Sequence, residues 1–265
     1  MVHFMGEEWE LHPAGGATGE AYIAEHGDQK IFIKRNSSPF LAVLSAEGIV
    51  PKLLWTKRLE NGDVITAQQW INSRELKSPE MKQNRVAKLL GKIHRSNELL
   101  DMFKRMGNSS LVPNELFIEL QEKIEQSKLK NILLENAMKW LELNVSEINT
   151  VEHVVCHSDV NHNNWILSGD DSLYLIDWDG AIVADPALDL SQLLYMYVPK
   201  GEWRQWLMDY GVTMTENLEK RLRWYMVAQS VEGILWCHQR ENINEGQKWS
   251  FLLSEVLNES ELYSS

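Results

Sequence analysis

The spacing of hydrophobic positions changes about a quarter of the way along the chain. Up to residue 70, short apolar runs are separated by turn-forming segments such as His26-Gly27-Asp28-Gln29 and Glu60-Asn61-Gly62-Asp63, a pattern typical of β-hairpins. The expected strands are residues 20–25, 30–34, 53–57 and 64–70. Between the two pairs, residues 40–48 have helical character after Pro39. The first quarter of the chain therefore predicts a small β-rich unit.

From Pro79 onward, the hydrophobic positions recur at helical spacing. Val86, Leu89, Leu90 and Ile93 form one apolar stripe. The further expected helices are residues 115–128, 132–143, 202–210, 216–239 and 245–257, with strand-and-loop segments at residues 153–166 and 172–176. We therefore predict an α+β fold with a β-rich lobe of residues 1–70 and a helical lobe of residues 71–265. The two lobes form one unit, with a crevice near residues 68–75.

The composition is that of a globular protein. The 265 residues are 44% hydrophobic and 24% charged, which is ordinary for this class. No apolar run approaches the roughly 20 residues of a membrane span, and the first ten residues lack the features of a secretory signal. The formal net charge of −12 argues against direct nucleic-acid binding, which needs a basic surface. Two cysteines, Cys156 and Cys237, indicate reduced thiols and a cytoplasmic location.

One polar stretch in the second half of the chain has the spacing of a phosphoryl-transfer site. His157, Asp159 and Asn164 form the pattern H-x-D-x-x-x-x-N, and Asp177 follows an apolar strand thirteen residues after Asn164. Asp159 is the candidate base that receives the proton of an acceptor hydroxyl. Asn164 and Asp177 offer the hard oxygen ligands that Mg²⁺ prefers. We also count His157 as a catalytic-site residue, with a structural hydrogen-bonding role rather than that of a second base.

The N-terminal lobe contains residues suited to ATP phosphates. The turn with Gly15, Gly16 and Thr18 would let backbone amides approach phosphate oxygens, although it matches neither a P-loop nor G-x-G-x-x-G, and a plain glycine hairpin is the alternative. Lys34 ends an apolar strand, from which its ammonium group would reach the α and β phosphates. Glu47, in the following short helix, is expected to pair with Lys34 and fix its position.

The segment between the two lobes is the expected adenine-binding linker. Gln69, Trp70 and Ile71 close the β-rich part, and their backbone would meet the base. The smaller lobe is then the nucleotide-binding lobe, and the larger lobe carries the catalytic residues and the acceptor. Two tryptophans beside the catalytic stretch, Trp165 and Trp178, would stack on a sugar ring or a quaternary ammonium group, or pack in the core, which we favour.

These motifs resemble the aminoglycoside phosphotransferase and choline kinase superfamily, which has a protein-kinase-like fold. His157, Asp159 and Asn164 match its catalytic-loop motif, and Asp177 matches its second metal-binding aspartate. The resemblance implies ATP and Mg²⁺ as cofactors and a small-molecule hydroxyl as acceptor. It also implies that Asp189, in Asp185-Pro186-Ala187-Leu188-Asp189, braces the catalytic loop. Ser158 departs from the family, which usually has glycine at this position.

The resemblance extends to a subgroup of Firmicutes cell-cycle regulators, the CcrZ subgroup. It is carried by runs such as Asn161-His162-Asn163-Asn164-Trp165 and Ile176-Asp177-Trp178-Asp179. It implies ribose or 2-deoxyribose as acceptor, a role in DnaA-dependent replication initiation, and replication-initiation or cell-division proteins as partners. Two alternatives stay open: a nucleotide-dependent regulatory scaffold with little turnover, and a choline, ethanolamine or aminoglycoside kinase.

Overall fold

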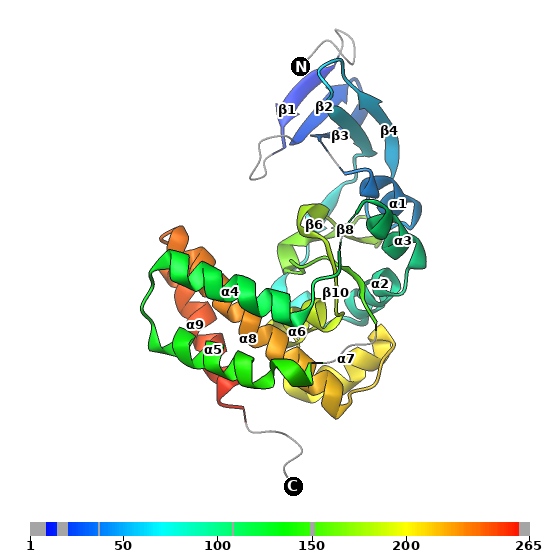
Figure 1. Cartoon of the computed structure of the whole chain (residues 1–265). Helices are drawn as coiled ribbons and strands as arrows, with labels where there is room; N and C mark the ends of the chain where they lie inside the picture. Colours follow the sequence, from blue (N-terminus) through cyan, green and yellow to red (C-terminus); the bar gives the residue numbers. More distant parts are fainter. Residues whose placement is uncertain (1–8, 15–20, 37, 108, 149–151, 260–265) are drawn as a thin grey trace.

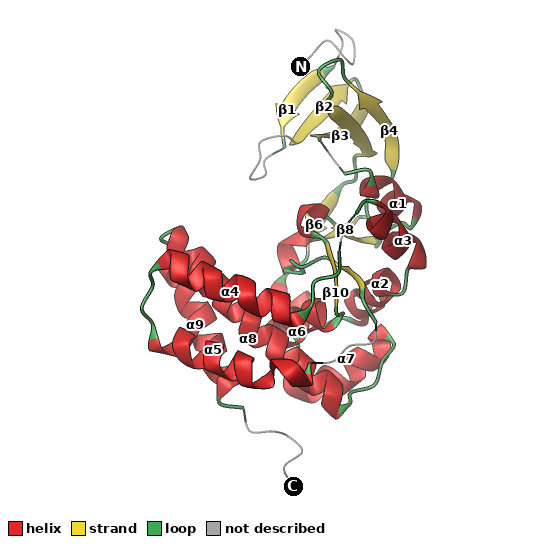
Figure 2. Ribbon diagram, in the orientation of Figure 1, coloured by secondary structure: helices red, strands yellow, loops and turns green. Residues whose placement is uncertain are grey.

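The computed structural model has two lobes joined by a short linker (Figures 1 and 2). It describes the chain except for residues 1–8, 15–20, 37, 108, 149–151 and 260–265. The smaller lobe contains a five-stranded antiparallel sheet with strand order β1-β2-β3-β5-β4. Its strands are β1 (Glu10–Pro13), β2 (Ala21–His26), β3 (Gln29–Arg35), β4 (Leu53–Arg58) and β5 (Val64–Gln69). The predicted β-rich lobe and its two hairpins are therefore confirmed.

The sheet has a small core of its own. Ile31 and Ile33 in β3 pack with Ile65 and Ala67 of β5 and with Ala24 of β2. Because successive side chains of a strand point to opposite faces, Lys34 leaves this core and faces the other side. That alternation fixes the direction in which its ammonium group extends.

The helix between the strand pairs, α1 (Phe40–Ala46), belongs to the core of the larger lobe. The ring of Phe40 lies 4.7 Å from that of Phe103 in α3 (Asn97–Arg105), and Leu44 is fully buried in the same core. The sequence assigned all of residues 1–70 to the smaller lobe, whereas the side chains of α1 pack with the core of the larger lobe. The helix buries its apolar side chains against α3, which lies beside it in Figure 1.

The larger lobe is mainly helical. Besides α3, it contains α2 (Asn84–His94), α4 (Pro113–Ser127), α5 (Ile132–Asn144), α6 (Ala187–Tyr197), α7 (Trp203–Tyr210), α8 (Glu216–Gln239) and α9 (Ile243–Leu257). Its short strands form two small sheets: β10 (Ile182–Ala184) with β7 (Val154–Cys156), and β6 (Ser73–Glu75), β8 (Trp165–Ser168) and β9 (Leu173–Leu175) in the order β6-β8-β9. In the described residues, no helix is long and apolar enough to cross a membrane.

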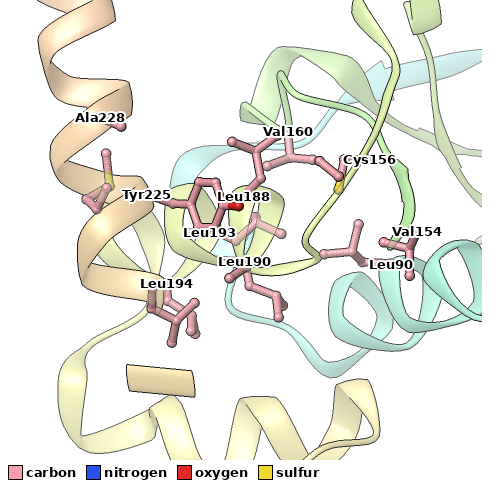
Figure 3. Close-up of a cluster of buried hydrophobic side chains, with 14 of the residues drawn as sticks. Leu90, Val154, Cys156, Val160, Leu188, Leu190, Leu193, Leu194, Tyr225 and Ala228 are labelled. Carbon is pink, nitrogen blue, oxygen red and sulfur yellow. The ribbon is translucent and has the colours of Figure 1, made fainter. Parts of the chain in front are cut away.

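Helix α6 forms the centre of the larger core. Leu188, Leu190 and Leu193 are nearly or fully buried, and Figure 3 shows them between Tyr225 of α8 and Leu90 of α2. Cys156 of β7 and the loop that follows it lie beside this packed helix. The loop after β7 is therefore anchored on the buried core of the larger lobe.

Candidate active site

The loop after β7 presents Asp159 at the surface, with one amide donor on each carboxylate oxygen. The Nδ2 group of Asn161 donates to Oδ1 at 2.6 Å. The Nδ2 group of Asn164 donates to Oδ2 at 3.1 Å and to the Asp159 carbonyl at 2.8 Å. Asp159 is exposed, and each oxygen of a carboxylate has a second lone pair. The carboxylate can therefore accept a proton from an incoming hydroxyl.

Asn164 and Asp177 are brought together by the backbone. The Ile176 N–H donates to the Asn164 carbonyl at 2.8 Å, which joins the end of the catalytic loop to the residue before Asp177. Since the Nδ2 group of Asn164 faces Asp159, its Oδ1 atom is left for a cation. Asp177 has φ 66°, a left-handed conformation that non-glycine residues adopt at some cost and that is common at functional sites. The predicted metal ligands thus lie on adjoining segments.

His157 connects the Asp159 loop and the segment before Asp177 from the buried side of the loop. The side chain is fully buried. Its Nε2–H donates to the Ile176 carbonyl at 2.8 Å, and its Nδ1 accepts the backbone N–H of Asp159 at 3.3 Å, as assigned from these partners. Both ring nitrogens are occupied by hydrogen bonds within the loop and to the Ile176 carbonyl, which agrees with the predicted structural role.

Asp189 of α6 supports the loop at the next residues. One carboxylate oxygen accepts the His157 N–H at 2.7 Å, and the other accepts the Ser158 N–H at 2.9 Å. Asp189 is fully buried and receives a third contact from His94 Nε2 at 3.1 Å. Its position is the bracing position that the family resemblance implied.

Ser158 occupies the loop position at which the resembled family usually has glycine. Its φ of 68° is left-handed, which explains a preference for glycine there. The serine hydroxyl donates to the Gly180 carbonyl at 2.6 Å and so ties the catalytic loop to the turn after Asp177. The hydrogen bond offsets part of the backbone cost.

The buried group around Asp189 is a hydrogen-bonded support. His94 Nδ1 lies 2.7 Å from the Tyr210 hydroxyl, and the Cys156 Sγ donates to the Asp185 carbonyl at 3.4 Å. Burial, with the negative charges of Asp189 and Asp185, raises the pKa of the Cys156 thiol well above its usual value. His94, Cys156 and Asp189 have the composition of a metal site, but their ligand atoms are already engaged and the thiol stays protonated.

Lys34 reaches across from β3 to the acidic side of the site. Its Nζ atom lies 2.8 Å from Asp179 Oδ2 and 3.7 Å from Asp177 Oδ1. The expected partner, Glu47, lies elsewhere: its carboxylate is 3.9 Å from Lys92 Nζ, and Lys92 also donates to the Glu47 carbonyl. The predicted Lys34–Glu47 pair is therefore not formed in this structure. Glu47 is the residue at the end of α1, which packs on the core of the larger lobe. The Glu47 carboxylate therefore faces Lys92 of α2.

The predicted adenine-linker residues lie between strand β5 of the smaller lobe and strand β6 of the larger lobe. Gln69 ends β5, and its N–H donates to the Lys52 carbonyl at 2.8 Å. Trp70 is 39% exposed and Ile71 is half-buried, so neither belongs to the core. The predicted phosphate-cradle residues Gly15, Gly16 and Thr18 lie outside the described residues.

The two tryptophans beside the site pack in the core, as favoured from the sequence. Trp165 is fully buried, and its Nε1–H donates to the Val160 carbonyl at 3.1 Å. Trp178 donates to the Leu175 carbonyl at 2.8 Å and contacts the rings of His157 and Phe40 edge-on. The sequence analysis missed Asn161, His94 and Tyr210. None of the three belongs to the H-x-D-x-x-x-x-N pattern, so its spacing could not find them.

An exposed carboxylate, two residues with oxygen ligands on adjoining segments and a lysine from the other lobe are the arrangement expected of a phosphotransferase with a protein-kinase-like fold. The model of the phosphotransferase enzyme family called APH matches residues 12–225, and the chain belongs to that family.

Solved structures of related fold cover nearly the whole chain. Choline kinase LicA from Streptococcus pneumoniae is 22% identical with a TM-score of 0.69, covering 94% of this chain and 95% of that chain. Spectinomycin phosphotransferase APH(9)-Ia, solved with ADP and spectinomycin, is 16% identical with a TM-score of 0.63, covering 94% and 93%. A choline/ethanolamine kinase family protein from Mesorhizobium loti is 14% identical with a TM-score of 0.69, covering 98% and 91%. At these identities the likeness shows the fold.

Proposed function

We propose that the chain transfers the γ-phosphoryl group of ATP to a hydroxyl of a small polar molecule, with Asp159 as the base. The observation that carries the proposal is the exposed Asp159 carboxylate, held by the amides of Asn161 and Asn164. The segment of Asp177 is joined to that of Asn164 by a backbone hydrogen bond. Asp159 takes the hydroxyl proton as the acceptor oxygen bonds to phosphorus and the bond from phosphorus to ADP breaks. LicA with AMP and APH(9)-Ia with ADP support a nucleotide in this fold.

The residues present fit a magnesium ion. Asn164 Oδ1 and the Asp177 carboxylate are hard oxygen ligands on adjoining segments, and their hydrogen bonds leave those oxygens available. When bound, Mg²⁺ neutralises the charge of the phosphate oxygens. Lys34 adds a positive charge on the side of the smaller lobe, where the α and β phosphates lie in related kinases.

The acceptor that we favour is a sugar, ribose or 2-deoxyribose. This choice rests on the resemblance to the CcrZ subgroup, because Trp165 is fully buried and Trp178 is partly buried, so the two rings favour neither a sugar nor a quaternary ammonium group. The test is ADP release with ribose, 2-deoxyribose, choline, ethanolamine, kanamycin and spectinomycin as acceptors, with the product identified by mass spectrometry. A pentose should give the highest kcat/KM. Highest turnover with choline or an aminoglycoside would replace this proposal with the choline or antibiotic kinase alternative.

The resemblance to cell-cycle regulators leads to a cellular role that we propose as well. The enzyme would act in the cytoplasm, where the free, buried Cys156 and Cys237 stay reduced, and would promote DnaA-dependent replication initiation through replication or division proteins. The test is replication timing in cells that carry only Asp159→Asn. Timing like that of a deletion supports a role for catalysis, and normal timing supports a regulatory scaffold.

A further inference from the structure

We infer that Asn161 is a positioning residue that holds Asp159 in the orientation needed for phosphoryl transfer. The inference rests on the proposed role of Asp159 as the base. It starts from the 2.6 Å hydrogen bond between Asn161 Nδ2 and Asp159 Oδ1.

The amide of Asn161 has only one orientation available. Its Oδ1 atom accepts the backbone N–H of Asn163 at 2.9 Å and caps the 3₁₀ turn His162–Asn164. A backbone N–H can only donate, so the carbonyl oxygen must occupy that end of the amide. The NH₂ end then faces Asp159. The cap therefore determines that Asp159 always meets a hydrogen-bond donor on Oδ1.

Asn161 and Asn164 hold the same carboxylate but have different second tasks. Asn164 donates to Oδ2 at 3.1 Å and supplies its own oxygen to the proposed metal site. The Asn161 Oδ1 atom accepts the Asn163 N–H and so caps the turn. With a donor on each oxygen, the carboxylate is held against rotation about its Cβ–Cγ bond, and the remaining lone pairs keep a fixed direction. Such fixation is the positioning that an in-line transfer requires.

The turn has a second support, which makes Asn161 testable. The Tyr197 hydroxyl at the end of α6 accepts the His162 N–H at 3.2 Å and lies 3.2 Å from His162 Nδ1. A variant that keeps an oxygen at position 161 should therefore keep the turn. Aspartate and serine are as good at this capping position as asparagine. Neither has the amide N–H group that donates to Asp159.

The experiment compares Asn161→Asp and Asn161→Ser with Asn163→Asp and Asn163→Ser. Asn163 lies in the same turn, and its side chain is exposed. ADP release is measured from Mg-ATP with water alone and with 2-deoxyribose, together with the Kd for ATP and the melting temperature. Loss of one hydrogen bond to a charged group predicts a kcat lower by about 10- to 100-fold in the Asn161 variants. Their Kd for ATP and melting temperature should match those of the Asn163 variants.

Four outcomes decide between this inference, the proposed function and a purely structural role. A lower kcat confined to the Asn161 variants supports the inference. Equal kcat values for the Asn161 and Asn163 variants, alongside an inactive Asp159→Asn, overturn it and leave the proposed function intact. Full activity of Asp159→Asn overturns both. A fall in melting temperature that accompanies the loss of kcat in both Asn161 variants would assign the residue a structural role only and also contradict the inference.

Discussion

Lys34 Nζ and Asp179 Oδ2 lie 2.8 Å apart and join strand β3 of the smaller lobe to the turn after Asp177 in the larger lobe. The pair places the Lys34 ammonium group, the proposed phosphate anchor, against Asp177 and Asp179. A polyphosphate entering this site must displace Asp179 from Lys34 and tolerate the nearby carboxylates. Nucleotide affinity should therefore depend strongly on the counter-charge that a divalent cation supplies.

Removing the Asp179 charge should reduce this dependence. We expect Asp179→Asn to bind ATP about 3- to 10-fold more tightly than wild type in EDTA, because one repulsive charge is gone and Lys34 is released. Isothermal titration calorimetry measures the effect. Asp171→Asn is the matched control, since Asp171 is exposed and pairs with Arg85. Equal EDTA affinities for wild type and both variants would show that the pair does not restrain Lys34.

Loss of the Lys34 cation should weaken nucleotide use. We expect Lys34→Met to lower kcat/KM for ATP by about 10- to 100-fold, the cost of a charge-assisted hydrogen bond to phosphate. Steady-state kinetics with varied ATP measure the change. Lys30→Met serves as control, because Lys30 lies in the same strand and pairs with Glu25 at 2.7 Å. A Lys34 variant that behaves like the Lys30 variant would remove Lys34 from the site.

Glu47 gives a prediction of the opposite kind. Its carboxylate faces Lys92 and not Lys34, and a partly exposed pair of this type contributes about 0–1 kcal/mol. We therefore expect Glu47→Gln to change kcat/KM for ATP by less than about threefold. A loss as large as that of Lys34→Met would mean that Lys34 exchanges Asp179 for Glu47 during turnover.

The buried Asp189 should matter for stability as well as activity. Asparagine at this position would place an NH₂ group against the backbone N–H donors or against His94, so one contact must be lost. We expect Asp189→Asn to lower the free energy of unfolding by about 2–4 kcal/mol. Urea denaturation measures the change, with the exposed Asp101→Asn as control. A stability equal to that control would show that the brace contributes little.

The sequence predicted most of the helices close to their observed bounds and missed α3 and α6. Helix α8 occupies the predicted residues 216–239. Helix α6 was missed because Ala187 to Leu194 are all buried, so no alternation between apolar and polar faces marks it. The loop residues were found from their spacing. The partner of Lys34 was assigned wrongly because sequence order cannot show that α1 packs on the larger lobe and takes Glu47 with it.

The central claim is that Asp159 is the base of a phosphoryl transfer. The most direct measurement is single-turnover transfer from Mg-ATP in wild type and Asp159→Asn, together with the Kd for ATP. A positioned base contributes about 10²- to 10⁴-fold, so we predict a rate loss of that size with an ATP Kd within about threefold of wild type, since Asp159 does not contact the nucleotide phosphates in this account. A variant that transfers phosphate at the wild-type rate would contradict the claim.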